Sequence, residues 1–559
     1  MTRLRCTHSL LRFALAPLAA LWAACRSPTG DADRPDAPTQ LAALATSPTS
    51  VRLDFASVDG AKSYQVDRAP ESGDFQSVGT STDPWFEDAG LTPGTTYRYR
   101  VAAHDASGTG DYAEPVSATT MPAGTRIALL AGSTKKDRTL RADTTYVIHG
   151  WAFVRAPATL RIDPGTQIVG DTLTPAATLL VDRGAKIVAD GTAGSPIVFT
   201  SQRPAGQRAP GDWGGLSIVG NARDNLRQSA FVQTEGPSGK TVIYTGGTND
   251  ADNSGVLRYV RIEFAGAPYE GTLNSNSLSL YAVGSGTTID HVQIANGLGD
   301  HFRWFGGTVD GRYLASYDAG DHHFDATEGY RGRNQFLVTL QTRVTSWSGG
   351  RTTDTPSAFV LQGCEPYIPG CDNLDQGPQT MPVFANFTAI GLPPGAAPTG
   401  VYNTGALFVY GGGGVFVNGI FARTDGRAVT AIDRWAQTMI QRDSVAFYHV
   451  LFAENRLDFD PENESTFRFA QAAHFAEGQN EMSGATLQHI VTALPSAPAT
   501  SPLDWSLPAS SPARTGGLTS FPTAVASRAG SAITPTAYRG AFDPNGGNWL
   551  AGWTRFERN

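Results

Sequence analysis

The chain has 559 residues, more than one hydrophobic core normally organises, so at least two folding units are expected. Its 62 glycines, 35 prolines and only 17% charged residues favour many short strands and turns over long helices. The formal net charge of −8 supplies no positive field for holding a polyanion, which argues against nucleic acid as a partner.

The segment 1–24 has the layout of a secretory signal peptide, with three arginines before an apolar run from Phe13 to Ala24. The run ends in Leu-Trp-Ala-Ala-Cys, which resembles the lipobox of bacterial lipoproteins except that Trp22 replaces an aliphatic residue. The resemblance implies a lipid on Cys25, with ordinary signal cleavage as the alternative. We therefore expect an exported protein of the bacterial cell envelope, at the outer membrane or cell surface. Its membrane contact would be the lipid alone, because no later apolar run reaches the length of a membrane span.

Residues 25–36 are polar and contain Pro, Asp and Gly, which predicts a flexible linker. Residues 37–121 follow as short strands of alternating apolar and polar side chains, for example at 50–55, 63–67 and 96–101. Such alternation is typical of half-buried strands, and a stretch of this length suits a β-sandwich.

The run Leu-Thr-Pro-Gly-Thr-Thr-Tyr at residues 91–97 resembles the fibronectin type III family. The resemblance implies that Tyr97 is the family's tyrosine corner, whose hydroxyl bonds back to the chain near the Leu and the Pro. Phe55 stands on the strand where many members carry Trp. We expect this module to be a spacer or platform, with binding of a glycan or another partner as the alternative.

From residue 126 to residue 494 the pattern changes to apolar strands of three to five residues punctuated by Gly, first at 160–170 and 177–191. Coils this thin cannot bury their own interior, so they must stack on one another. The segments 257–262 and 289–294 superpose position by position at a constant offset, which keeps the inward side chains and changes the outward ones.

The motifs Gly-Asp-Trp-Gly-Gly (211–215), Gly-Gly-Thr-Asn-Asp (246–250) and Tyr-Arg-Gly-Arg (330–333) resemble those of exported bacterial proteins in the pectate-lyase-like superfamily. The resemblance implies an all-β chain, with a fibronectin type III β-sandwich followed by a right-handed parallel β-helix. Most proteins of this group have no known function, so the resemblance assigns no reaction. Residues 495–559 are loop-rich and are expected to pack on the β-helix or to cap it.

Cys364 and Cys371 are the two cysteines left in the folded part of the chain, at the ends of a short loop with Pro and Gly. Export would place them in an oxidising compartment, so we expect a disulfide. A metal site is the alternative, although no further Cys or His lies nearby in the sequence.

The densest group of ionisable side chains lies in two consecutive coils, residues 299–307 and 320–329. Alignment of the two coils matches Asp300 with Asp321 and, after one inserted His, Phe302 with Phe324. Like charges on adjacent strands, about 4.8 Å apart, need compensation. Turn N–H groups, Arg303 set against Asp325, or a bound Ca²⁺ would supply it.

The ionisable residues of these two coils are compatible with two enzyme mechanisms. In a lyase, Ca²⁺ would acidify a sugar proton beside a uronate carboxylate, and an arginine or a histidine would act as base. In a glycoside hydrolase, two carboxyl groups would serve as acid and base. The catalytic candidates are Asp321, His322, Asp325, Glu328 and Arg331. The candidates for contact with the ligand are Arg303, Trp304, Tyr330 and Arg333. The candidate Ca²⁺ ligands are Asp300, Asp321 and Asp325.

The alternative is structural: the aspartates at coil corners accept backbone N–H bonds, and Arg303, Arg331 and Arg333 neutralise them. Complete motif sets of polygalacturonase-like hydrolases or of pectate lyases do not occur in this region. The leading hypothesis is therefore a non-catalytic, adhesin-like surface protein whose β-helix presents a rigid face to a polysaccharide, a surface glycan or another cell-surface component. The rival hypothesis is a polysaccharide lyase or glycoside hydrolase centred on residues 300–333.

Overall fold

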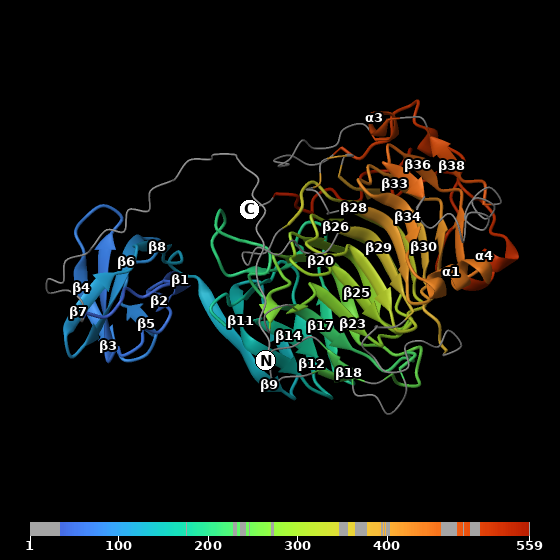
Figure 1. Cartoon of the computed structure of the whole chain (residues 1–559). Coiled ribbons are helices and arrows are strands. Elements are labelled where there is room, and N and C mark those ends of the chain that lie inside the picture. Colours follow the sequence, from blue (N-terminus) through green and yellow to red (C-terminus); the bar gives the residue numbers. More distant parts are fainter. Residues whose placement is uncertain are drawn as a thin grey trace, which may run out of the picture. The chain divides into compact units, whose positions relative to one another are not determined.

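The computed structural model describes residues 34–174, 176–226, 232–234, 242–244, 246–269, 273–345, 356–363, 377–392, 395, 397, 403–459, 478–483, 486–491 and 504–557. The chain forms two compact units, Met1–Ala123 and Gly124–Asn559 (Figure 1). The predicted signal peptide, the lipidation site Cys25 and the predicted Cys364–Cys371 disulfide lie outside the described residues. None of the helices in the described part of the chain has the length and hydrophobicity of a transmembrane span.

The first unit is an antiparallel β-sandwich, as predicted. One sheet contains β1 (Ala42–Ser47), β2 (Ser50–Asp54) and β5 (Trp85–Ala89). The other contains β3 (Ser63–Pro70), β4 (Gln76–Ser81), β6 (Thr96–Asp105), β7 (Gly108–Tyr112) and β8 (Val116–Thr119). The Tyr97 hydroxyl accepts the Thr92 N–H at 3.1 Å, which confirms the predicted tyrosine corner.

The second unit is a right-handed parallel β-helix whose coils contain three stacked sheets, here called sheets I, II and III. Sheet I contains β10 (Arg138–Leu140), β12 (Thr159–Ile162), β15 (Lys186–Asp190), β32 (Gly414–Val417) and β35 (Val445–Tyr448). Sheet II contains β9 (Arg126–Thr134), β11 (Thr144–Val154), β13 (Gln167–Gly170), β16 (Ile197–Ser201), β33 (Ile420–Ala422), β36 (Leu451–Ala453) and β38 (Glu481–Ser483).

Five long strands in the middle of the β-helix belong to both of these sheets, because each begins in sheet I and ends in sheet II. They are β20 (Gly255–Glu263), β24 (Thr288–Ala295), β26 (Gly311–Tyr317), β28 (Arg333–Leu340) and β30 (Val383–Ile390). Sheet III takes the ends of β9 and β11 and continues with β14 (Thr178–Val181), β17 (Gly215–Val219), β23 (Leu278–Tyr281), β25 (Phe302–Phe305), β27 (Phe324–Thr327), β29 (Ser357–Gln362), β31 (Thr404–Val409), β34 (Arg427–Ala431) and β37 (Leu457–Phe459).

The remaining elements are short and lie between coils or after the last coil. Two antiparallel pairs join β18 (Val232–Thr234) to β19 (Val242–Tyr244) and β21 (Pro268–Tyr269) to β22 (Leu273–Asn274). The helical segments are α1 (Arg434–Gln441), α3 (Leu487–Ile490), the 3-10 turn η1 (Pro512–Arg514) and α4 (Thr523–Ala529).

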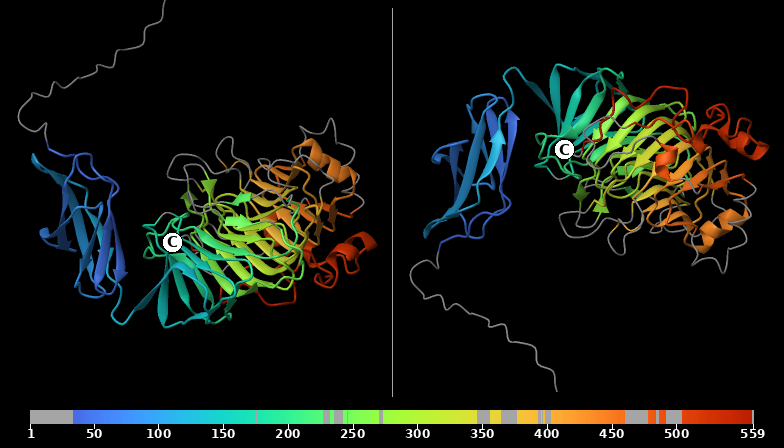
Figure 2. Two further views of the ribbon diagram at one scale, coloured as in Figure 1. Left: turned by 90° about the horizontal axis from the view of Figure 1, so that it is seen from below. Right: turned by 90° about the horizontal axis from the view of Figure 1, so that it is seen from above.

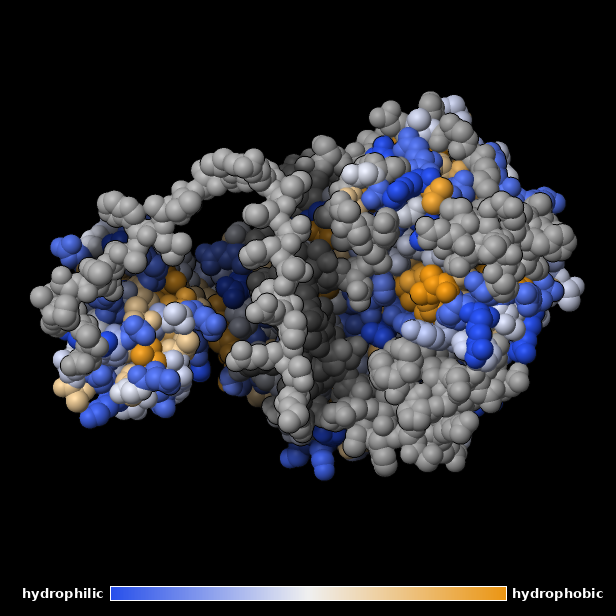
Figure 3. Space-filling view, in the orientation of Figure 1, coloured by the Kyte–Doolittle hydropathy of each residue, from blue (hydrophilic) through white to orange (hydrophobic). Residues whose placement is uncertain are grey.

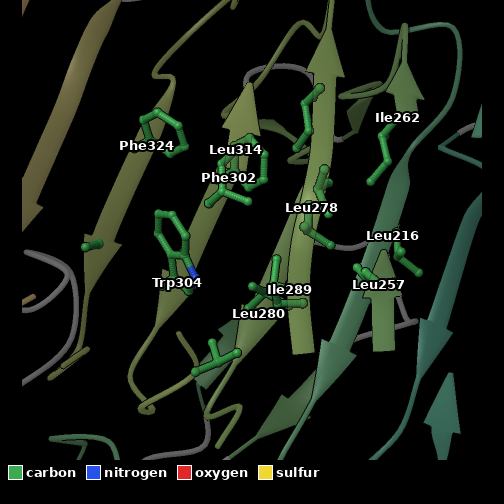
Figure 4. Packing of buried hydrophobic residues seen from close by; sticks show 14 of the residues in the cluster. Leu216, Leu257, Ile262, Leu278, Leu280, Ile289, Phe302, Trp304, Leu314 and Phe324 are labelled. Atoms are coloured by element: carbon green, nitrogen blue, oxygen red, sulfur yellow. The ribbon is translucent and has the colours of Figure 1, made fainter. Parts of the chain in front are cut away.

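Inward side chains form continuous apolar columns through the coils, and Figure 4 shows part of this packing. In the pairing of β20 with β24, Leu257 lies opposite Ile289 and Ile262 opposite Ile294, which confirms the superposition expected from the sequence. Phe302 likewise lies opposite Phe324, with ring centroids 5.0 Å apart. These columns are buried only when the coils stack, because the inner residues of one coil are covered by those of the next.

The corner between sheets I and II is a single residue in the left-handed conformation. Tyr259, His291, Tyr313 and Phe336 have φ of 47°, 52°, 55° and 63°. Their rings stack at centroid distances of 4.4, 4.4 and 4.9 Å along the β-helix. A non-glycine residue in this region carries backbone strain of about 1–3 kcal/mol, so the stacked rings and the tertiary packing around them must offset it.

The C-terminal segment lies along the outside of the coils, where Figure 2 shows it in red. Apolar residues from 487–556, among them Trp505, Phe542 and Trp553, pack on the outward side chains of sheet II. Side-chain amides of the coils bind the backbone of this segment: Gln335 donates to the Thr534 carbonyl at 2.7 Å and accepts its N–H at 3.0 Å. The helix α4 packs through Val525 and Ala529 on the late coils of sheet I.

Candidate functional site

Sheet III carries the candidate residues on its outward face, because alternate residues of a strand point to opposite sides. On β25 the inward residues are Phe302 and Trp304, whereas Arg303 and Phe305 point outward. The next strand repeats the pattern with Asp325 and Thr327 on the outside. The outward residues that pair in register across the middle strands are Ser217, Ser279, Arg303, Asp325 and Val360.

Arg303 lies between two buried carboxylates on this face. Its Nη1 is 2.9 Å from Asp300 Oδ2, and its Nε is 3.7 Å from Asp325 Oδ2. Asp325 also accepts a hydrogen bond from the Gln362 amide at 3.1 Å. The side chains of Asp300 and Asp325 are only 2% and 1% exposed, so the arginine supplies charge compensation that water does not. One arginine thus serves both carboxylates.

His322, rather than Asp321, lies over Asp300. The N–H of His301 donates to the His322 carbonyl and that of Phe302 to the His323 carbonyl, so the register that pairs Phe302 with Phe324 extends back through the turn. The expected match of Asp300 with Asp321 is therefore wrong by one residue. The His322 N–H donates to Asp300 Oδ1 at 3.0 Å, and this turn N–H gives the second compensation for the buried charge.

The His322 ring lies on the same side as the carboxylates, with Nε2 3.2 Å from Asp321 Oδ1. Burial opposes the charged form, but the carboxylates of Asp321, Asp300 and Asp325 outweigh it and raise the pKa of His322. The ring is also held from the neighbouring strand, because its Nδ1 accepts the Ser357 N–H of β29 at 3.4 Å.

His301 and His323 point into the β-helix and form a hydrogen-bonded chain through Ser316. His301 Nε2 accepts the Gly297 N–H at 3.0 Å, so its proton is on Nδ1, which donates to Ser316 Oγ at 2.7 Å. The hydroxyl in turn donates to His323 Nδ1 at 2.6 Å. Burial lowers the pKa of His301 well below its usual value and that of His323 to about 3. Both rings are neutral, and the three side chains are closed to a ligand because they are at most 1% exposed.

Trp304 and Tyr330 also lie inside the coils. Their rings stack on each other at 5.0 Å and 11°, and the Tyr330 hydroxyl donates to the Val309 carbonyl at 2.8 Å. Figure 4 shows Trp304 among the inward side chains beside Phe302 and Phe324. The expectation that Trp304 and Tyr330 contact a ligand is therefore wrong for this structure, since neither ring has a face open to solvent.

The two arginines of the Tyr-Arg-Gly-Arg motif are bound to carboxylates. Arg333 pairs with Asp310 through Nε at 2.9 Å and Nη2 at 2.6 Å, and its backbone N–H donates to the same carboxylate. This pairing raises the pKa of Arg333. Arg331 lies 3.2 Å from Asp250, which Arg223 also binds. Burial alone would raise the pKa of Asp250, but the arginines lower it to about 2.

Glu328 is fully buried at a corner residue with φ of 57°. Its backbone carbonyl accepts the Asn225 N–H at 2.9 Å. The carboxylates nearest to the surface in this region are Asp321, at 28% exposure, and the ion-paired Asp250 and Asp310, at 27% and 29%. The predicted acid and base residues are therefore distributed between the interior, a corner and an outer face.

Asp300, His322 and Asp325 are the described residues whose ligand atoms come close enough for a metal, within 4.8 Å of one another. The set differs from the predicted one, because His322 takes the place of Asp321. It does not fit Ca²⁺, which prefers six to eight oxygen ligands. Arg303 also places a positive charge 2.9 Å from Asp300, so a cation would have to displace it.

Sequence reasoning missed the partners of the arginines. Asp250 lies in the quoted motif Gly-Gly-Thr-Asn-Asp, and Asp310 stands just before β26, but neither was matched with an arginine. Arg331 follows Asp250 by 81 positions, so no local spacing connects them. Ser316 was missed as well, although its place on an inward strand position beside two histidines is a signal of a buried polar contact.

The chain was compared with protein families. Residues 132–491 match the family described as pectate-lyase like beta helix domain. Residues 36–119 match the fibronectin type III domain. The order of these two matches along the chain is the order predicted from the sequence.

Comparison with individual proteins found shorter likenesses. A poly(3-hydroxybutyrate) depolymerase of Ralstonia pickettii is 39% identical over 109 residues, which cover 19% of this chain and 21% of that protein. The chain thus spans about a fifth of the length of this relative. An Fn3-like protein from Clostridium thermocellum is 29% identical and covers 15% of this chain and 90% of its own, with a TM-score of 0.14. A structure named FN3tt is 21% identical, covers 16% and 95%, and has a TM-score of 0.15.

Proposed function

Because the chain belongs to the family of the pectate-lyase-like β-helix domain, we propose that it is an exported, non-catalytic protein whose sheet III face binds a polysaccharide or a surface glycan. The fibronectin type III module spaces this face away from the cell, and a lipid on Cys25 tethers the chain to the envelope. The proposal is thus adhesin-like, and a polysaccharide lyase or glycoside hydrolase is its rival.

The observation that carries the proposal is the pairing of the candidate acids and bases. Asp300 and Asp325 are compensated by Arg303, whereas Arg331 and Arg333 are bound to Asp250 and Asp310. A general acid or base must reach a substrate atom within hydrogen-bond distance. These side chains face each other, which supports a structural role for them.

The proposed surface lies at the late coils of sheet III, because the outward residues Ser279, Asp325 and Val360 of its middle strands are at most 2% exposed. C-terminal residues pack on sheet II and on the late coils of sheet I. At the late coils of sheet III, Tyr410 and Ile432 follow β31 and β34 and are 37% and 55% exposed. Figure 3 shows an apolar patch near the place of β29 in Figure 1. An exposed aromatic beside an aliphatic side chain is a surface on which a sugar ring can stack.

The test of catalysis uses the purified chain with a panel of acidic and neutral polysaccharides in the presence of Ca²⁺. We expect no increase in reducing ends and no unsaturated products. Cleavage by the parent that the Asp321→Ala/Asp325→Ala variant loses would overturn the proposal and support the rival enzyme.

The test of binding uses affinity electrophoresis in gels that contain each polysaccharide. We expect at least one of them to retard the parent and to retard Tyr410→Ala/Ile432→Ala less. Leu129→Ala is the matched control, since Leu129 is 60% exposed on β9 in sheet II. Equal weakening by the control would remove the assignment to sheet III.

The lipid anchor has a separate test. Cys25→Ser expressed in a bacterial host is expected to move from the membrane fraction to the soluble fraction and to lose labelling with a palmitate analogue. An unchanged membrane fraction would contradict lipidation at this cysteine, without bearing on what the sheet III face binds.

A further inference from the structure

The outer face of the larger sheet in the first unit carries a stack of cations and aromatic rings. On β6, Tyr99 and Val101 point into the sandwich core, so Arg98 and Arg100 point outward. The Arg98 guanidinium lies 5.0 Å from the ring of Phe75, and the Arg100 guanidinium lies 4.5 Å from the same ring. Arg100 also lies 3.9 Å from the ring of Tyr112 on β7. The order of the stack is Arg98, Phe75, Arg100, Tyr112.

Hydrogen bonds beneath the stack hold its members in place. Arg100 donates to Asp67 Oδ2 through Nε at 3.1 Å and Nη2 at 2.9 Å, and Asp67 is 3% exposed although it lies on the outer face. The Gln65 amide donates to both Asp67 and the Tyr112 hydroxyl, at 3.1 and 2.9 Å. The stack is therefore preorganised, so a ligand would not have to order flexible side chains.

Arg98 differs from Arg100 in its partners. It donates through Nε to the Pro70 carbonyl at 3.3 Å and through Nη2 to the Gly73 carbonyl at 2.6 Å. Carbonyls satisfy hydrogen-bond donors but do not neutralise the charge. Among the salt bridges of the described residues, Asp67 serves Arg100, and no carboxylate serves Arg98. The stack thus holds two guanidinium groups and one carboxylate.

A fixed guanidinium with spare donors is suited to a carboxylate ligand. Its donors lie in a plane, and stacking on an aromatic ring fixes that plane while leaving the edge open. In Arg98 the bonds to Pro70 and Gly73 use Nε and Nη2, which leaves the Nη1 donors for a ligand. The guanidinium would bind a neutral sugar more weakly, because a neutral acceptor forms a weaker hydrogen bond than a carboxylate.

The surroundings of the stack favour a thin, hydrated chain over a globular partner. Among the other outward residues of β3 and β6, Ser63, Gln65 and His104 are polar, whereas the apolar ones, Ala69 and Ala102, are small and fully buried. A stable protein interface needs an apolar core within about 800 Å² on each side. We propose that Arg98, Phe75, Arg100 and Tyr112 form a second binding site, which takes the carboxylate of a uronic acid unit in an acidic polysaccharide. This site is independent of the sheet III face.

The experiment uses the full chain and polygalacturonate fragments as the probe, with the methyl-esterified fragments as the uncharged comparison. Isothermal titration is expected to show binding of the acid form, and Arg98→Gln is expected to weaken it about tenfold or more, as for loss of one charge-assisted contact. Arg98→Lys keeps the charge but loses the planar donors, so it is expected to bind more weakly than the parent.

Arg52→Gln is the matched control on the opposite sheet. Arg52 also stacks on an aromatic ring, at 4.8 Å from Trp85, and it pairs with Asp54 at 2.9 Å. Binding by the parent that Arg98→Gln lowers and Arg52→Gln leaves unchanged supports the site. Equal effects of the two variants, full binding by Arg98→Lys, or no binding by the parent would each overturn it.

Three further measurements separate uronate binding at the stack from misfolding, from binding of acidic peptides and from binding elsewhere. Thermal unfolding of Arg98→Gln is expected to match the parent, since Arg98 is half-buried and has no carboxylate partner within the described part of the chain. Loss of the unfolding transition would show that this variant is misfolded. Phe75→Leu would then be titrated in its place. Polyglutamate is the acidic peptide probe, and binding of polyglutamate in preference to polygalacturonate would overturn the assignment to a polysaccharide. Tyr410→Ala/Ile432→Ala is titrated in parallel, and a loss there alone would place uronate binding on the β-helix.

Discussion

The same two coils of the β-helix bury charge in one way on the outside and polar groups in another way on the inside. On the outer face Asp300, Arg303 and Asp325 form an ionic cluster. His301 and His323, which directly follow Asp300 and His322 in the chain, turn inward and share the Ser316 hydroxyl as neutral rings. Adjacent residues of one Gly-Asp-His motif thus join different networks: Asp300 pairs with Arg303 on the outside, and His301 bonds to Ser316 on the inside. Whether a residue points outward or inward from the coil, rather than the motif it belongs to, decides whether it joins the ionic cluster or the neutral chain.

Removal of the arginine from the outer cluster is expected to have the largest effect. Arg303→Met removes the ion-pair partner that two buried carboxylates share, so the free energy of unfolding is expected to fall by about 3–5 kcal/mol in urea denaturation at pH 8. The additional changes Asp300→Asn and Asp325→Asn are expected to restore most of it. Arg333→Met is the control, since its pair with Asp310 is 28% and 29% exposed and is expected to cost less than about 1 kcal/mol. A small effect of Arg303→Met would show that the outer cluster is not an obligate charge pair.

Removal of the bridging hydroxyl tests the inner chain. Ser316→Ala leaves the His301 Nδ1–H and the His323 Nδ1 unpaired, and we expect a loss of about 2–4 kcal/mol because each buried unsatisfied group costs about 1–3 kcal/mol. Ser217→Ala on the outward face of β17 is the control and is expected to stay within about 0.5 kcal/mol. Equal stability of the two variants would mean that the inner chain contributes nothing to the fold.

The pH dependence separates the two sides further. The pKa of His323 is about 3 in the fold and 6.5 in the unfolded chain, so the unfolded state binds more protons between these values. The stabilisation is complete above pH 6.5 and is lost as the pH falls toward 3, with a slope of about 1.4 kcal/mol per pH unit for one histidine. His323→Gln is expected to flatten this slope in denaturation curves between pH 4 and pH 6. An unchanged slope would assign acid sensitivity to other groups.

Metal removal is expected to have the smallest effect. Arg303 already compensates Asp300 and Asp325, so addition of Ca²⁺ or EDTA is expected to leave the thermal unfolding midpoint of the parent unchanged within about 1 °C. A rise with Ca²⁺ that the Asp300→Asn variant abolishes would show that a cation competes with the arginine. The outer cluster would then be a metal site after all.

Much of the β-helix follows from local pattern. The pairing of Leu257 with Ile289 and of Phe302 with Phe324 was predictable because strands of period two must repeat their inward residues from coil to coil. The corner residues Tyr259 and His291 were not predictable in this way. Within 257–262 and 289–294 they read as ordinary strand residues, yet both adopt the left-handed conformation. Ring stacking between coils, which depends on tertiary contact, holds them there.

The candidate site was predicted only in part. Its location in two consecutive coils and the pairing of Arg303 with Asp325 followed from the repeat that matches Phe302 with Phe324. The one-residue shift places His322 over Asp300. It depends on the position in the turn at which the extra histidine is inserted, and the backbone hydrogen bonds determine that position. Trp304 and Arg303 are neighbours on one strand, so one points into the β-helix and the other points outward. Which of them points inward depends on which face of the strand is inside.

By itself, the sequence determined that short apolar strands must stack into coils after a β-sandwich, since neither pattern can bury its apolar residues otherwise. Tertiary structure alone decided which outer faces of the coils are covered by the C-terminal segment. Residues 487–491 and 504–556 return over coils that precede them in the chain, and the Gln335 amide binds a backbone group 199 positions away. No local pattern in the sequence predicts such a contact, because the contact stabilises the fold only when the two distant segments meet.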